Sequence, residues 1–130
     1  TMNVGLTSAM VLSAKLLPFM APNASMLFIS GTFQDGGANW LPYYTSKRAL
    51  EDFIVGLAAD QAGRVGVYGV SPAPTATASL ERYNPGASAA AQSPESVARV
   101  CVDVLLGRLN VSSGTIVEVR DGKPGMGYHR

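Results

Sequence analysis

The sequence predicts an α/β fold in which a parallel sheet of about three strands is flanked by helices. Segments with apolar residues at helical spacing alternate with short apolar runs that end at glycine, proline or serine, as expected when helices connect parallel strands. The run from Met26 to Ile29 is apolar without interruption, which is typical of a parallel strand covered on both faces. A chain of 130 residues with 47% hydrophobic residues is large enough for one core.

The first half of the chain predicts two helices and two strands. In chain order they are a helix over 5–20, a strand over 25–30, a helix over 43–61 and a strand over 65–70. Pro18 should kink or end the last turn of the first helix, because proline lacks the amide hydrogen that a helix interior needs. The second helix places Leu50, Ile54 and Leu57 on one face and should stop near Gly63.

The second half predicts one further helix and one further strand, over 93–107 and 115–120. Ser93 is suited to cap the helix and Pro94 to occupy its first position. Residues 71–92 are rich in alanine, serine and proline without a sustained period, so we expect a connection that acts as a lid or binding loop. We expect residues 123–130 to form a flexible tail.

Charge and composition exclude several classes of function. The formal net charge of +1 gives no electrostatic reason to expect nucleic acid or a membrane as a partner. The sequence has no apolar run near the ~18 residues that span a bilayer, and we expect a cytoplasmic protein. Cys101 lies among valines and is predicted to be a buried thiol. His129 is assigned no catalytic duty, and no metal site is predicted because cysteine and histidine are not clustered.

Tyr43 and Lys47 are the most informative pair of side chains. A spacing of four places them about one turn apart on one helical face, where an ammonium would favour the phenolate and lower the phenol pKa. Ser30, thirteen positions before Tyr43, could give a reacting oxygen a second hydrogen bond. Tyr44 and Arg48 have the same spacing, but Tyr43 matches both Lys47 and the serine. By itself the pair could also be a half-buried aromatic beside a solvated lysine.

Four stretches, taken together, resemble the C-terminal half of a short-chain dehydrogenase/reductase over residues 3–120. They are Asn3-Val4-Gly5 at the start of a helix, the strand that ends at Ser30, the pair Tyr43 and Lys47, and the loop 70–77. The resemblance implies a partial Rossmann-like fold and a carbonyl or alcohol as the substrate. It also implies NAD or NADP as the cofactor and a homodimer or higher oligomer.

The resemblance also implies a role for each matching residue. Tyr43 would be the acid/base, Ser30 would bind the substrate oxygen, Lys47 would hold the nicotinamide ribose, and Asn3 would position a water for proton relay. The cofactor would contact Tyr43 and Lys47 and also the loop residues Pro72, Ala73, Thr75 and Thr77. Taken singly, Ser30, Asn3 and Thr77 are more often a turn former, a helix cap and a solvated loop residue.

The sequence departs from the family pattern at two positions and lacks one of its motifs. Ala73 stands where the family loop has glycine, and Asp121-Gly122-Lys123 replaces a terminal glycine pair. No glycine-rich turn of dinucleotide-binding spacing opens a helix anywhere in the sequence.

The missing turn leaves three possibilities: a fragment of a longer enzyme, a truncated relative, or one part of a two-chain protein. Two functions stay open, an oxidoreductase half that is inactive alone and a non-enzymatic assembly or interaction module. Trp40, ahead of the tyrosine helix, could border a substrate pocket or anchor its loop.

Overall fold

The computed structural model describes residues 1–31 and 37–125, and it confirms an α/β architecture. The helical elements are η1 (Asn3–Thr7), α1 (Ser8–Leu16), η2 (Leu17–Phe19), α2 (Leu41–Asp60), α3 (Ala78–Tyr83), η3 (Ala87–Ala90) and α4 (Pro94–Leu105). The strands are β1 (Ser25–Ile29), β2 (Gly66–Pro72), β3 (Ile116–Arg120) and β4 (Lys123–Pro124). Each of the six predicted elements is present, with ends that differ by a few residues.

The sheet has the strand order β1-β2-β3-β4. β1, β2 and β3 are mutually parallel, with Ser25 opposite Gly66 and Val70 opposite Val117, and β4 is antiparallel to β3. Among the described residues β1 pairs with a strand on one side only, so it forms an edge of the sheet. The backbone groups on the outer side of β1 therefore lack a strand partner in this part of the chain.

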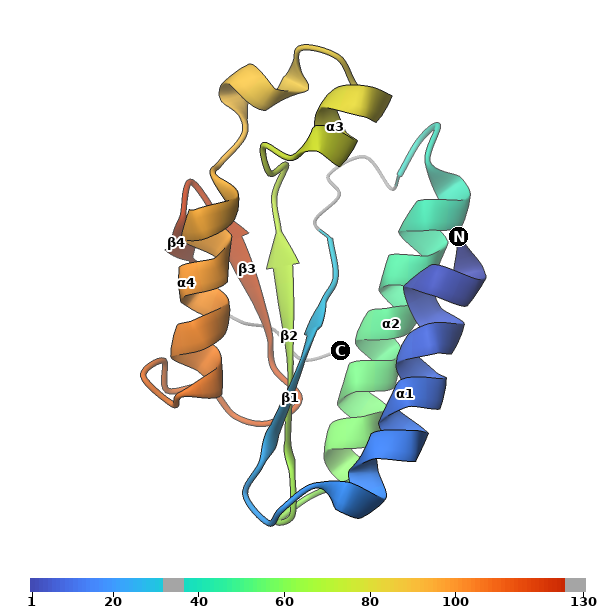
Figure 1. Ribbon diagram of the computed structural model, residues 1–130, viewed down its shortest axis with the longest axis vertical. Helices are drawn as coiled ribbons and strands as arrows, with labels where there is room; N and C mark the ends of the chain where they lie inside the picture. The colour runs from blue at the N-terminus through green and yellow to red at the C-terminus, as the bar shows by residue number, and fades with distance from the viewer. Residues whose placement is uncertain (32–36, 126–130) are drawn as a thin grey trace.

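Helices cover both faces of the sheet, so that the sheet is the middle of three layers (Figure 1). α1 and α2 lie side by side on one face, and α4 lies on the other. The first core cluster joins α2 to the sheet through Leu50, Ile54, Val67 and other buried residues, and the second joins α4 through Val100, Val104 and their neighbours. The predicted inward face of the helix over 43–61 is thus confirmed.

Helix ends follow the local sequence signals. The side chain of Ser93 accepts a hydrogen bond from the Ser96 amide and caps α4, as predicted. Pro18 lies within the short 3₁₀ turn η2, where the regular helix has ended. At the start of the chain the residues of η1 form a π-helix rather than an α-helix. Gly5 lies there against α2, since a Cβ on Gly5 would come 2.8 Å from the Ser46 Oγ.

Three expectations need correction. The stretch 71–92 is not without secondary structure, because it contains α3, capped by Thr77, and η3. Cys101 is half-buried rather than fully buried, and burial raises the pKa of its thiol. The segment predicted as a tail begins with β4, which adds a fourth strand to the sheet, while residues 126–130 and His129 lie outside the described part.

Candidate active site

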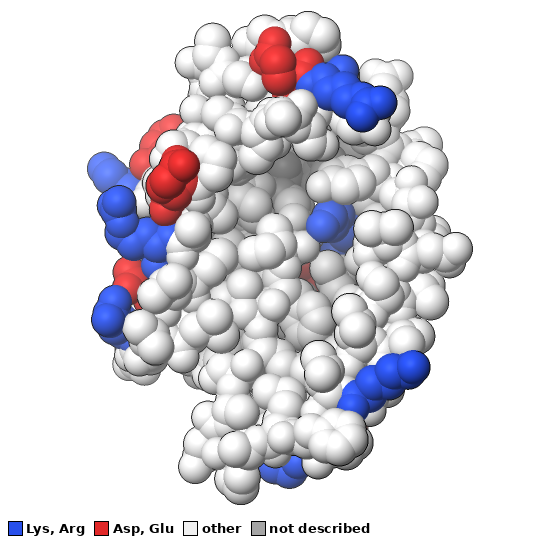
Figure 2. Space-filling view, in the orientation of Figure 1, with Lys and Arg blue, Asp and Glu red and all other residues white. Residues whose placement is uncertain are grey.

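A groove of about 620 Å³ runs along the outer side of β1, between the sheet edge and α1. Its walls are mostly apolar and include Leu12, Leu16, Met26 and Phe28. Of the residues that the structure describes, two with ionisable side chains line it, Tyr43 and Lys47, both from the first turns of α2. Figure 2 shows this face of the molecule with few charged side chains over α1 and β1, while charged residues gather over α3 and α4. The groove is therefore an apolar hollow with a phenol and an ammonium on its wall.

The structure brings Tyr43 and Lys47 together as their spacing predicts. The Lys47 Nζ lies 5.5 Å from the centre of the Tyr43 ring and donates a hydrogen bond of 2.9 Å to the Ile29 carbonyl. Of the three donors on an ammonium, this carbonyl takes one, so others can reach an acceptor in the groove. Arg48, by contrast, lies 5.9 Å from the Tyr44 ring, and neither residue lines the groove. The geometry favours Tyr43 over Tyr44.

The pKa of the phenol differs from the sequence expectation. Partial burial raises the pKa of Tyr43 above its ordinary value, and partial burial lowers the pKa of Lys47. The expected lowering of the Tyr43 pKa by Lys47 is therefore wrong for this chain. The reason is that the ammonium lies over the ring while the loss of water disfavours the phenolate.

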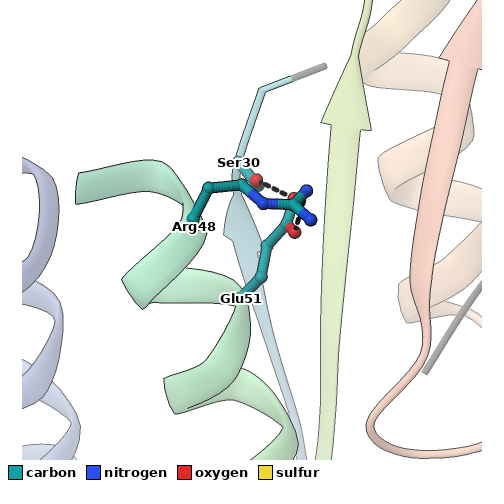
Figure 3. Close-up of polar contacts among 3 residues, drawn as sticks. All are labelled: Ser30, Arg48 and Glu51. Carbon is teal, nitrogen blue, oxygen red and sulfur yellow. Dashed lines mark hydrogen bonds and ion pairs between the residues drawn. The ribbon is translucent and has the colours of Figure 1, made fainter. Parts of the chain in front are cut away.

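Ser30 is nearly fully buried, and its hydroxyl donates to the Glu51 Oε1. Glu51 is itself completely buried and forms an ion pair with Arg48, whose NH1 lies 2.9 Å from the Glu51 Oε2. Figure 3 shows the Arg48 and Glu51 side chains meeting at the end of β1, where Ser30 lies. The Ser30 hydroxyl has one hydrogen to donate, so it cannot donate to a substrate oxygen while it donates to Glu51.

The remaining predicted site residues lie elsewhere. Asn3 is exposed at the start of η1 and is absent from the groove wall. In the loop, the Thr77 hydroxyl accepts from the Leu80 amide at 3.1 Å and caps α3. The Thr75 hydroxyl donates to the Ala73 carbonyl at 2.9 Å, and Pro72 ends β2. These loop residues follow β2 directly, at the carboxyl edge of the sheet, where α/β proteins bind ligands.

Two residues that the sequence reasoning did not single out hold this region together. Glu51 falls on the inward face of α2 beside Leu50, where an acidic residue is unusual, and that position was the available signal. Gln92 bridges the base of the loop, as its Nε2 donates to the carbonyls of Ala73 and Val119, each at 3.0 Å. No local pattern marks Gln92, because its partners are distant in sequence.

The mostly parallel sheet is covered by helices on both faces and has a Tyr–Lys pair beside its edge strand. This arrangement defines an α/β protein of Rossmann-like type. A family model described as short chain dehydrogenase matches residues 1–88. The chain belongs to the short-chain dehydrogenase family, which confirms the resemblance seen in the sequence. No curated protein matches the chain.

Solved structures agree with this assignment of the fold. The chain is similar to a short chain dehydrogenase from Salmonella enterica serovar Typhi, with a TM-score of 0.80 and 24% identity over 90% of this chain and 50% of that chain. A protein from Shigella flexneri described as a short chain dehydrogenase and complexed with NADP has a TM-score of 0.79, 24% identity and coverage of 90% and 51%. The aldohexose dehydrogenase of Thermoplasma acidophilum has a TM-score of 0.78, 20% identity and coverage of 93% and 56%. The chain spans about half the length of these proteins.

The residues present fit only one end of a nicotinamide dinucleotide. The Lys47 ammonium on the groove wall can bind a ribose hydroxyl, and the apolar wall beside Tyr43 can take a nicotinamide ring. No glycine-rich turn opens a helix among residues 1–31 and 37–125, so the described chain offers no cradle for the pyrophosphate. Over the same residues no helix is long and apolar enough to cross a membrane.

Proposed function

We propose that this chain is the catalytic half of an NAD(P)-dependent oxidoreductase that transfers a hydride between a nicotinamide and a carbonyl or alcohol carbon. The observation that carries the proposal is the Tyr43–Lys47 pair, which lines an open apolar groove at the edge of a parallel sheet. Membership of the short-chain dehydrogenase family supports the class of reaction.

In the reducing direction, Tyr43 gives its phenol proton to the substrate oxygen as the carbonyl carbon accepts a hydride, and the product is an alcohol. A bound reduced nicotinamide supplies that hydride. Tyr43 is protonated at neutral pH, because a phenol has an ordinary pKa of 10.0 and partial burial raises the pKa of Tyr43 further, so the proton is present in the reducing direction. Lys47 holds the ribose and lies close enough to stabilise the phenolate that remains.

The proposal includes a requirement for a dinucleotide-binding half, because the described residues hold no pyrophosphate cradle. The open side of β1 is the proposed place for it, since no strand of the described residues pairs with that side and an apolar groove lies beside it. This chain spans about half the length of the similar structures, so each of them contains a second part of about the same length. Covalent linkage and association with a second chain would both satisfy this requirement.

Calorimetric titration of the 130-residue chain with NADPH and with NADH tests the site directly. Lys47→Ala should remove any saturable binding, while Lys15→Ala is the matched control, because Lys15 lies on α1 and does not line the groove. Binding that both variants retain would contradict the proposed ribose contact. If the folded wild-type chain binds neither nucleotide, it requires its other half, and the titration is repeated on the assembled protein.

A second function, an assembly or interaction module without catalysis, is favoured by the exposed apolar surface. Met10, Val11 and Leu12 of α1 are each about half exposed, at 46%, 47% and 56%, and Leu12 also lines the groove beside β1. Surfaces of this kind recruit partners. We propose a homodimer or higher oligomer as the form in solution, which sedimentation velocity measures.

Tyr43→Phe separates the two functions. The loss of the phenol hydroxyl should abolish turnover by the assembled enzyme, because Tyr43 is the proposed acid and Lys47 is the other ionisable side chain on the groove wall among the described residues. The same variant should leave assembly unchanged, since the ring and its packing are retained. Unchanged turnover would exclude Tyr43 as the acid and would favour the assembly function.

A further inference from the structure

Glu51 is a completely buried carboxylate in the middle of α2, facing the end of β1. Ser30 donates to one of its oxygens, and Arg48 pairs with the other at 2.9 Å (Figure 3). Burial of a charged group is unfavourable unless partners satisfy it, and an apolar residue of similar volume often serves stability as well. A carboxylate at this position therefore suggests a task other than stability.

The task follows from the neighbours of Glu51 along α2. Lys47 and Glu51 lie one turn apart and contact two adjacent residues, Ile29 at the end of β1 and Ser30 directly after it. Lys47 binds the Ile29 carbonyl at 2.9 Å, and Glu51 binds the Ser30 hydroxyl. The amide of Ser30 in turn donates to the Val70 carbonyl at 2.8 Å, which continues the pairing of β1 with β2. The end of β1 is thus fixed on one side by the sheet and on the other by two polar contacts from α2.

We propose that Glu51, supported by Arg48, is a positioning residue of the site: it accepts the hydrogen bond of the Ser30 hydroxyl, fixes the end of β1, and so places the Ile29 carbonyl that holds the Lys47 ammonium beside Tyr43. This inference rests on the proposed function for its consequence in catalysis, but the positioning itself does not depend on turnover. It assigns Ser30 a positioning role through β1 in place of direct contact with the substrate oxygen.

Charge and burial around Lys47 support the assignment. Tyr43, Arg48 and Glu51 are ionisable side chains on this part of α2, and Thr1, which carries the N-terminal ammonium, lines the same groove from the start of the chain. The β1 residues in the groove, Met26 to Ile29, are apolar. Partial burial lowers the pKa of Lys47, as expected for an ammonium kept against the sheet. If the end of β1 were released, the Lys47 side chain would gain water and its pKa would return toward its ordinary value.

Titration of the lysines by NMR after reductive ¹³C-methylation tests the proposal without any need for activity. The sequence contains Lys15, Lys47 and Lys123, so each signal can be assigned with a single Lys→Arg variant. Ser30→Ala should move the titration of Lys47 to higher pH and leave Lys15 unchanged. Ser13→Ala is the matched control, because Ser13 is also buried but bonds only the Ala9 carbonyl of its own helix, and it should move neither signal.

Ser30→Cys guards against a failure of Ser30→Ala to fold. Cysteine has nearly the shape of serine but donates weakly, so it should fold and move the Lys47 titration in the same direction. An unchanged Lys47 titration in folded Ser30→Cys or Ser30→Ala would overturn the proposal. Failure of the proposed function would look different, since the assembled protein would bind no nucleotide while the Lys47 titration still responded to Ser30.

In the assembled enzyme the same variants separate positioning from contact with the substrate. Glu51→Gln keeps the shape of the side chain and leaves Ser30 in place, so a direct role of Ser30 predicts turnover equal to or above that of the wild type. A positioning role of Glu51 predicts a loss of turnover and a weaker affinity for the nucleotide, because Lys47 is displaced. Turnover and affinity at the wild-type level in Glu51→Gln would contradict the proposal.

Discussion

The rings of Trp40 and Tyr83 meet edge to face, with their centres 6.4 Å apart and an angle of 89° between their planes. Trp40 immediately precedes α2, and Tyr83 ends α3, so this contact joins the helix that carries Tyr43 to the segment that follows β2. The sequence left open whether Trp40 borders a substrate pocket or anchors its loop. The contact with Tyr83 fits an anchor, and it ties Trp40 to α3 as well as to its own loop. An edge-to-face pair of this kind is worth about 0.5–1.5 kcal/mol.

Tyr83→Leu should release α3 from the start of α2. Trp40 is the only tryptophan in the chain, so its fluorescence reports the contact directly. We expect the emission of Trp40 to shift to the red and its quenching by iodide to increase, because the exposed indole loses its covering ring. Tyr68→Phe is the control, since Tyr68 lies in β2 and packs against the second core cluster. A fluorescence change of equal size in both variants would argue against the contact.

Gln92 is predicted to clamp the base of the loop that α3 belongs to. Its side chain bonds the carbonyls of Ala73 and Val119 and accepts from the Gly122 amide at 3.0 Å, so Gln92→Ala leaves three backbone groups without this partner. We expect the free energy of unfolding in urea to fall by about 1–3 kcal/mol.

Gln61→Ala is the matched control for the clamp. The Gln61 side chain accepts only from Arg64, in an exposed pair at the end of α2, so its removal should change stability by about 0.5 kcal/mol or less. Gln92→Ala should also speed proteolysis at Arg82, because the loop that carries α3 would be held less firmly at its base. Equal stability of the two variants would exclude a clamp.

The fold could be predicted from the sequence where burial follows a simple period. The apolar run of β1, the inward face of α2 and the cap at Ser93 are local signals, and the structure agrees with each. α3 was missed because a helix of six residues in an alanine- and serine-rich segment has no room for an apolar period. Its cap at Thr77 was the one available signal, and Thr77 had been assigned to a cofactor contact.

The candidate site divides in the same way. Tyr43 and Lys47 lie on one helix, so their spacing alone predicts that they meet. The partner of Ser30 depends on how β1 docks on α2, and the direction of the Tyr43 pKa depends on burial in the folded chain. Neither can be read from spacing, because both arise from contacts between segments that are distant in sequence.

The raised pKa of Tyr43 gives a pH dependence of known sign. A difference titration near 295 nm between the wild type and Tyr43→Phe should place the Tyr43 phenol above its ordinary value of 10.0. Because the folded chain holds this proton more tightly than the unfolded chain, the contribution to stability is present below pH 10.0 and is lost as the pH rises through the folded pKa. The wild type should therefore lose stability relative to Tyr43→Phe in alkaline buffer. A phenol that titrates below its ordinary value would instead support the original expectation that Lys47 dominates.

Gly5 lets η1 lie directly against α2, beside the turn that carries Tyr43 and Lys47. A Cβ on Gly5 would come 2.8 Å from the Oγ and 3.1 Å from the Cβ of Ser46, a side chain with no exposed surface. Gly5→Ala should therefore push the two elements apart and lower the free energy of unfolding by about 1–3 kcal/mol. The same change should weaken nucleotide binding in the assembled enzyme if α2 shifts with its site residues.

Gly56→Ala is the matched control for Gly5, because Gly56 also lies in a helix but a Cβ there would have no neighbour within 4 Å. We expect this variant to gain about 0.5–1 kcal/mol, since alanine loses less backbone entropy than glycine in a helix. Ser46→Ala removes the nearer of the two clashing atoms, so adding it to Gly5→Ala should recover part of the lost stability. Ser46→Ala alone should not stabilise the wild-type chain. If Gly5→Ala instead stabilises the chain as Gly56→Ala does, then η1 is not packed closely on α2, and the site does not depend on that contact.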